Sequence, residues 1–83
     1  MFYIYAIYNK KHGKIYIGQS HDPVEREKLH NNHTFKHSYT SRFDGDWKLI
    51  YVETCTTRKS AIKREKQLKS YRGREYIKNF IPR

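Results

Sequence analysis

An arginine and a histidine stand four residues apart in the segment that follows the first nineteen residues. At that spacing Arg26 and His30 would share one face of a helix. A guanidinium can neutralise charge that develops on a phosphate, and an imidazole can transfer a proton or orient a water molecule. The pair is therefore a candidate for phosphate chemistry, although a solvated polar helix face would have the same spacing.

A carboxylate interrupts the apolar stripe of a second predicted helix. Ala61, Glu65 and Leu68 follow the spacing i, i+4, i+7, so all three should face the core. A carboxylate at a buried edge is costly unless it is paired with a cation or bound to a metal. The sequence leaves both interpretations of Glu65 open: a salt bridge with a neighbouring lysine or arginine, or a metal ligand.

Two tyrosines occupy neighbouring strands of a predicted hairpin. Tyr5 and Tyr16 can lie close together there. A tyrosine can act as a general base only if cations or a metal lower its pKa from about 10, the value in model peptides. Otherwise the two residues are aromatic members of the core or of a sheet face, as most strand tyrosines are.

The remaining histidines and the cysteine carry weaker signals. His30, His33 and His37 have the spacing H-x2-H-x3-H, which a zinc site could use, but no cysteine lies near them. Cys55 is the one cysteine, which excludes an internal disulfide and a multi-cysteine zinc site. We therefore expect no zinc and interpret Cys55 as a small buried residue.

Hydrophobic patterning and capping residues predict the elements that must position these side chains. Asp22, Pro23 and Glu25 have the pattern of a helix start, and Thr56 or Thr57 would cap a second helix. Strands are expected at 2–8, 14–19 and 47–53, and helices at 23–31, 57–70 and 75–80, with a break at 72–74. A loop with room for a short helix or strand at 39–43 should fill 33–46.

The order β-β-α-β-α-α predicts one α/β (α+β) domain over residues 1–83. A small central three-stranded sheet would be flanked by helices. Alternation along the first strand places Tyr3, Tyr5 and Ile7 on one face. In the third strand it places the side chains of Trp47, Leu49 and Tyr51 together.

The charge balance points to a polyanionic partner. The 83 residues contain 18 Lys and Arg against 8 Asp and Glu, a formal net charge of +10. Residues 58–83 hold 10 of the basic residues and 2 of the acidic ones, so +8 of the charge lies there. Such a balance favours nucleic acid over a membrane surface, because the basic segment has few bulky aliphatic residues. No stretch approaches a membrane helix and no signal peptide is seen, so we expect an intracellular, cytoplasmic protein.

Four segments of the sequence resemble the GIY-YIG nucleases. Residues 3–5 (YIY) and, ten residues later, 16–18 (YIG) resemble the paired signature, with Tyr3 in place of the usual glycine. Residues 22–31 are similar to the family helix that carries an arginine and, four residues later, a histidine. The strand at 47–53 and the helix at 61–69 look like the family elements that follow. The likeness is greatest to small single-domain bacterial proteins similar to the N-terminal nuclease domain of an excinuclease.

The resemblance implies a role for each candidate residue. Glu65 would bind one Mg²⁺ or Mn²⁺, with water and phosphate completing the coordination shell. Tyr5, with Tyr16 as second candidate, would deprotonate or position the attacking water. Arg26 would stabilise the charged transition state, and His30 would assist proton movement. The expected substrate-binding residues are Gly18, Lys63, Lys69 and Asn79.

These expectations combine into a metal-dependent endonuclease that hydrolyses DNA phosphodiester bonds, with a role in DNA repair. Two alternatives stay open from the sequence. One is a nucleic-acid-binding module without catalysis, which would show salt-sensitive binding and no cleavage. The other is an accessory protein that docks on an acidic protein partner.

Overall fold

The computed structural model describes residues 1–31 and 39–82 and has the predicted order of elements. The strands are β1 (Phe2–Asn9), β2 (Lys14–Ser20) and β3 (Trp47–Cys55). The helices are α1 (Pro23–Asn31), the 3₁₀ helix η1 (Tyr39–Arg42), α2 (Arg58–Lys69) and α3 (Tyr71–Lys78). The α+β fold with its three-stranded sheet is therefore confirmed. Among the described residues no helix is long and apolar enough to cross a bilayer. Two members of the histidine triplet, His33 and His37, lie outside the described part.

The predicted hairpin forms, and its first strand lies in the centre of the sheet. β1 pairs antiparallel with β2 on one side and with β3 on the other, giving the order β2-β1-β3. In the hairpin Tyr5 pairs with Gly18, and Ile7 pairs with Tyr16. The YIY and YIG segments therefore meet at one pair, Tyr5 with Gly18.

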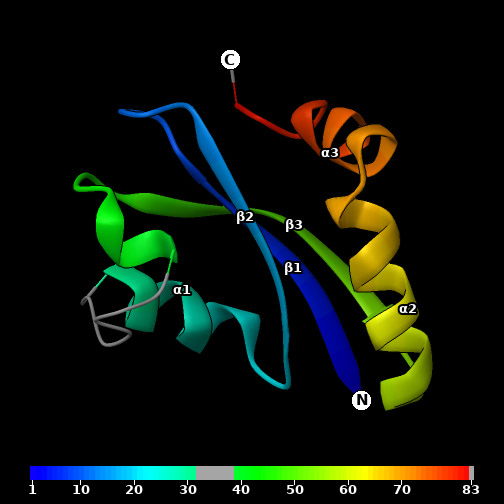
Figure 1. The fold of residues 1–83 in the computed structure, drawn as a ribbon. Coiled ribbons are helices and arrows are strands. Elements are labelled where there is room, and N and C mark those ends of the chain that lie inside the picture. Colours follow the sequence, from blue (N-terminus) through cyan, green and yellow to red (C-terminus); the bar gives the residue numbers. More distant parts are fainter. Residues whose placement is uncertain (32–38, 83) are drawn as a thin grey trace.

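Helices cover both faces of the sheet, with α1 on one side and α2 with α3 on the other (Figure 1). The alternation of β1 divides its side chains between two clusters. Ile4 and Ala6 pack with α2 and α3 residues such as Leu68. Tyr5 and Ile7 pack on the α1 side with the other buried aromatic side chains. The residues predicted to carry chemistry on β1 and β2 therefore face α1.

A β-bulge in β3 overturns one predicted face. Ala6 pairs with Tyr51 but Ile7 pairs with Leu49, so Ile50 is an extra residue that reverses the alternation. Trp47 and Leu49 stay on the α1 side, whereas Tyr51 packs on the α2–α3 side. The prediction that Tyr51 shares a face with Trp47 is wrong, because strict alternation does not hold across a bulge.

The connection between α2 and α3 also differs from the prediction. The helix breaks at Ser70, and Gly73 lies inside α3 rather than in a break at 72–74. The Ser70 hydroxyl accepts a hydrogen bond from the Gly73 N–H (3.2 Å) and donates one to the Gln67 carbonyl (2.6 Å). One serine thus caps both helices. Gly73 permits the close approach: a Cβ there would lie 2.2 Å from the Gln67 carbonyl oxygen.

Gly73→Ala should therefore destabilise the fold by about 3 kcal/mol, because the added methyl group would push α3 away from α2. Helix propensity alone would predict the opposite, a gain in stability of about 1 kcal/mol for alanine over glycine. Urea unfolding would measure the effect, with Arg72→Ala at the exposed neighbouring position as control. Equal unfolding midpoints for wild type and Gly73→Ala would contradict this packing.

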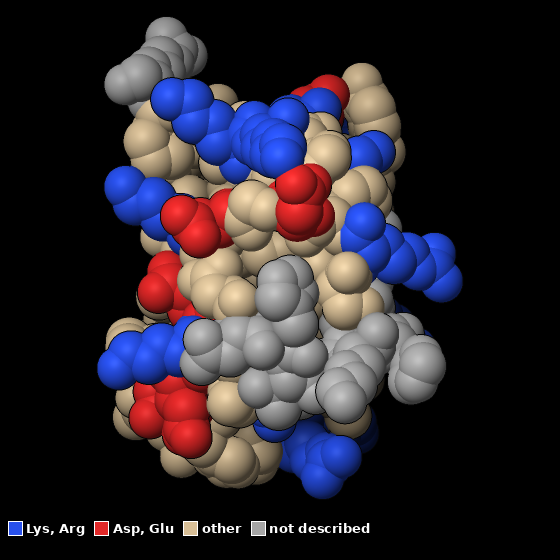
Figure 2. Space-filling view, turned by 90° about the vertical axis from the view of Figure 1, so that its left-hand side faces the viewer, with Lys and Arg blue, Asp and Glu red and all other residues tan. Residues whose placement is uncertain are grey.

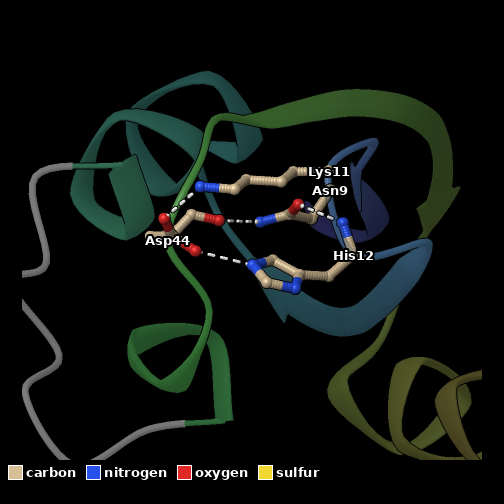
Figure 3. A network of polar contacts seen from close by, with 4 residues as sticks. All are labelled: Asn9, Lys11, His12 and Asp44. Carbon is tan, nitrogen blue, oxygen red and sulfur yellow. Dashed lines mark hydrogen bonds and ion pairs between the residues drawn. The ribbon is translucent and has the colours of Figure 1, made fainter.

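The hairpin turn is held against the loop that precedes β3 (Figure 3). Asn9 is fully buried; its amide donates to the Asp44 carbonyl (2.9 Å) and accepts from the His12 N–H (3.1 Å). The Asp44 carboxylate pairs with Lys11 and with the His12 ring. Hydrogen bonds from Lys11 and His12 lower the pKa of Asp44 to about 2. These contacts fix the turn next to the loop that leads into β3.

Candidate active site

A chain of three buried polar side chains joins β1, α1 and η1. The Tyr5 hydroxyl is hydrogen-bonded to His30 Nε2 (3.1 Å), and His30 Nδ1 is hydrogen-bonded to the Thr40 hydroxyl (2.7 Å). The three residues are 2%, 3% and 1% exposed, respectively. Both nitrogens of the imidazole thus have protein partners. Thr40 was not among the predicted site residues, because a threonine in a polar loop carries no signal for contact with a histidine ten residues away.

Burial moves the pKa values of Tyr5 and His30 in opposite directions. It raises the pKa of Tyr5 above its ordinary value, and the nearby Tyr16 adds to this, while the Arg26 charge lowers it. Burial, together with Arg26, lowers the pKa of His30 to about 4. At neutral pH the first group therefore stays a phenol and the second an uncharged imidazole. Neither state suits a residue that must accept or donate a proton easily.

Tyr16 lies beside this chain on the edge strand β2. Its ring centroid is 4.9 Å from that of His30 and 6.2 Å from that of Tyr5. Tyr16 is half-buried, whereas Tyr5 is covered. The two tyrosines therefore differ in accessibility because β1 is the central strand and β2 an edge.

Gly18 makes room for both tyrosines. A Cβ at this position would lie 2.9 Å from the Tyr5 hydroxyl oxygen and 3.0 Å from Cε2 of Tyr16. Because real Cβ atoms do not approach other atoms so closely, any side chain here would displace a tyrosine. The structure thus gives Gly18 a packing role within the cluster, beside the substrate-binding role that the sequence predicts.

Arg26 lies on α1, one turn before His30, and is half-buried. Its charge lowers the pKa values of both Tyr5 and His30, so the guanidinium lies close to the hydrogen-bonded pair. Arg26 also lines an open groove with residues that connect β2 to α1 and with Arg58 at the start of α2. It can therefore act at the cluster and meet a ligand from solvent.

Glu65 reaches the same neighbourhood from α2. Ala61 and Leu68 are buried as predicted, and the Glu65 side chain between them is 20% exposed. Its carboxylate forms an ion pair with Lys69 (3.1 Å), and its charge contributes to the raised pKa of Tyr5. The salt-bridge interpretation is thus confirmed, and the carboxylate is near enough to Tyr5 to act on it electrostatically.

The surroundings of Glu65 also fit a divalent cation. Within 1–31 and 39–82 no three His, Cys, Asp or Glu side chains come together, so an ion at Glu65 would need water or phosphate oxygens as further ligands. Mg²⁺ suits such a site, since it keeps several waters and uses substrate phosphates as ligands. The Lys69 partner is 47% exposed, and an exposed ion pair contributes at most about 1 kcal/mol. A metal ion could therefore displace Lys69.

The four expected substrate-binding residues separate into two groups. Gly18 and Lys69 contact catalytic candidates, as described above. Lys63 instead lines a groove on the β3 side of α2, together with Glu53 and Arg64. Asn79 is the exposed C-cap of α3. Helical spacing explains why Lys63 lies away from Glu65, because two residues that are two apart on a helix point to different sides.

The buried imidazole predicts a pH dependence of stability. The pKa of His30 is about 4 in the folded state and about 6.5 in an unfolded chain, so the unfolded chain binds more protons between these values. Stability should therefore fall as pH drops from 6.5 towards 4, by up to about 3 kcal/mol. Urea unfolding across this range would measure it. His30→Gln should lose this slope and His21→Gln, at an exposed site, should keep it; equal slopes in all three proteins would contradict the assignment.

Comparison with known families adds the deciding observation. The family model of the GIY-YIG catalytic domain matches residues 1–78. The chain belongs to the GIY-YIG family. Membership implies a nuclease that hydrolyses phosphodiester bonds in nucleic acid, and GIY-YIG nucleases generally use a divalent metal. Comparison with curated proteins and with solved structures finds no significant match.

This GIY-YIG domain accommodates its departure from the signature at the end of the sheet. Tyr3 replaces the usual glycine, pairs with Ser20 and Thr54, and is half-buried. The pairing of Tyr5 with Gly18 two residues later is kept. The replacement at Tyr3 therefore leaves β1 paired with both of its neighbours.

Proposed function

We propose that the protein is a divalent-metal-dependent endonuclease in which Tyr16, rather than Tyr5, activates the attacking water. The half-buried position of Tyr16 at the edge of the sheet is the observation that carries this assignment. Tyr5 is 2% exposed, and its pKa is raised. The structural role left to Tyr5 is to hold His30 in place.

Arg26 and Glu65 would act on the phosphate from opposite sides of β2. Arg26 would bind its oxygens and stabilise the additional negative charge of the transition state. Glu65 would hold Mg²⁺ or Mn²⁺ after Lys69 has moved away. The bound ion would supply Lewis-acid stabilisation of the same charge. Cations at the reacting phosphate would also favour transfer of a proton to the nearby phenol oxygen of Tyr16.

His30 would position rather than transfer protons. Its ring nitrogens are engaged by Tyr5 and Thr40, and its pKa of about 4 keeps it uncharged. Its ring lies 4.9 Å from that of Tyr16, measured between centroids. This contact supports a role in orienting the Tyr16 ring.

DNA as substrate, a part in repair and a cytoplasmic location complete the proposal. Support comes from the likeness to the nuclease domain of an excinuclease and from the net charge of +10. Figure 2 views the molecule from the α1 side, where acidic side chains stand among the basic ones. Most of the net charge belongs to residues 58–83, which include α2 and α3. A nucleic-acid backbone would therefore meet its main electrostatic attraction on the two helices around Glu65.

Nicking of supercoiled plasmid with Mg²⁺ or Mn²⁺ would test the assignment of the two tyrosines. Tyr16→Phe should lower the rate by about 10²- to 10⁴-fold, the usual contribution of a general base. Tyr5→Phe should retain more activity and lose about 1 kcal/mol of stability with the hydrogen bond to His30. A larger loss of rate in Tyr5→Phe than in Tyr16→Phe would overturn the assignment, and no nicking by wild type would overturn the enzyme itself.

A binding module without catalysis is the second candidate. The observation that favours it is Tyr3, because the first signature element departs from the family pattern there. Such a module would bind DNA with a steep salt dependence and leave the plasmid intact with either metal.

A further inference from the structure

We propose that the groove between the hairpin turn and α3 binds an unpaired segment of the nucleic acid, with Tyr71 as the surface on which a base stacks. The proposal rests on the nuclease function above and names the kind of substrate: DNA with a single-stranded part next to the cleaved bond. Three observations support it: the charge of α3 along the groove, the position of the groove beside Glu65, and the exposure of one aromatic ring.

The α3 wall of the groove is basic, because α3 contributes Arg74 and Lys78. Lys14 lines the hairpin wall, but its ammonium lies over the Phe43 ring (5.7 Å to the centroid). The one acidic side chain in the lining, Glu75, is already ion-paired with Lys78 (3.2 Å). Cations spaced along an open groove are the arrangement that follows a phosphate backbone.

The groove lies beside Glu65 of the candidate active site. Glu65 pairs with Lys69, and the Lys69 carbonyl accepts a hydrogen bond from Arg74 Nε (3.2 Å). A strand whose phosphate lies at Glu65 would therefore pass Lys69 and Arg74 into the groove.

Tyr71 distinguishes a single strand from a duplex. It begins α3, lines the groove and is 79% exposed, the most exposed of the large hydrophobic side chains in the described part of the chain. The other exposed rings of this region, Tyr76 and Phe80, pack against Tyr51. An exposed ring among cations offers stacking to an unpaired base, whereas the bases of a duplex are stacked on each other.

Fluorescence anisotropy with labelled oligonucleotides, in EDTA so that no cleavage occurs, would test the proposal. The probes are oligothymidylate and a duplex of the same length. Tyr71→Ala should lower the ratio of single-strand to duplex affinity by about 5- to 100-fold, and Tyr71→Trp should restore it. Tyr76→Ala, which removes an exposed ring from the same helix outside the groove, should keep the wild-type ratio.

An unchanged ratio in Tyr71→Ala, or an equal fall in Tyr76→Ala, would overturn the proposal. The outcome is separate from that of the nuclease assignment, which plasmid nicking with metal tests. If the wild type nicks plasmid but its single-strand binding does not depend on Tyr71, only the proposed role of the groove is refuted. If single-strand binding depends on Tyr71 but the wild type does not nick plasmid, the nuclease assignment is refuted and the groove stands as a binding site.

Discussion

Glu65→Gln should reduce metal-dependent nicking of supercoiled DNA by about a thousandfold or more. The amide keeps the size of the side chain but loses the charge that would hold the divalent ion. Lewis-acid stabilisation by a bound metal contributes several kcal/mol, and each 1.36 kcal/mol is a factor of about ten in rate. Gel electrophoresis of plasmid over time, with Mg²⁺ or Mn²⁺, would measure the loss.

Glu53→Gln is the matched control for this prediction. Glu53 of β3 also forms an ion pair with a basic residue of α2, Arg64 (2.7 Å), and its side chain is 28% exposed. This variant should nick at close to the wild-type rate. Isothermal titration of Mn²⁺ adds a second readout, because binding should disappear in Glu65→Gln and persist in Glu53→Gln. Wild-type nicking and Mn²⁺ binding in Glu65→Gln would refute the metal site.

Arg26→Ala should lower the nicking rate by about 10²- to 10³-fold, the effect of removing one preorganised donor from a developing charge. Arg26→Lys should recover only part of it, because an ammonium lacks the planar fork that binds two phosphate oxygens. Circular dichroism would establish that both variants are folded, and the plasmid assay would give the rates. Arg42→Ala, at an exposed position on η1, serves as the control for loss of positive charge.

The same substitution has a readout that does not depend on activity. The Arg26 charge contributes to the low pKa of His30, so the pKa should rise from about 4 in Arg26→Ala. NMR titration of the imidazole would detect the shift. A full nicking rate together with an unchanged His30 titration would place Arg26 away from the cluster.

The order of elements could be predicted because local signals specify it. Asp22 accepts a hydrogen bond from the Glu25 N–H (3.1 Å), and Thr57 caps α2 as its sequence suggests. The alternation of β1 likewise separates the two core clusters correctly. The bulge at Ile50 and the close approach of α3 to α2 at Gly73 could not be predicted from local sequence signals. Both arise from contacts between segments that are brought together only by the fold.

In the candidate site, too, local spacing could be predicted from the sequence, whereas contacts between distant segments could not. Spacing placed Arg26 and His30 on one helix face and Glu65 in an apolar stripe, and both features are present. The sequence could not rank Tyr5 against Tyr16, because both are tyrosines in strands of similar composition. Their difference comes from the sheet: Tyr5 on the central strand is buried, whereas Tyr16 on the edge strand is half-buried. Thr40 was missed for a related reason, as its partner lies in another element.

A crystal structure of the Tyr16→Phe variant with a DNA oligonucleotide and Mn²⁺ would test the central claim most directly. Anomalous scattering locates the ion independently of any assumption about its ligands. We predict a manganese peak at the Glu65 carboxylate, Lys69 displaced from it, and a DNA phosphate between the ion and Arg26. A peak at another place, with Glu65 still paired with Lys69 and no phosphate at Arg26, would contradict the proposed active site.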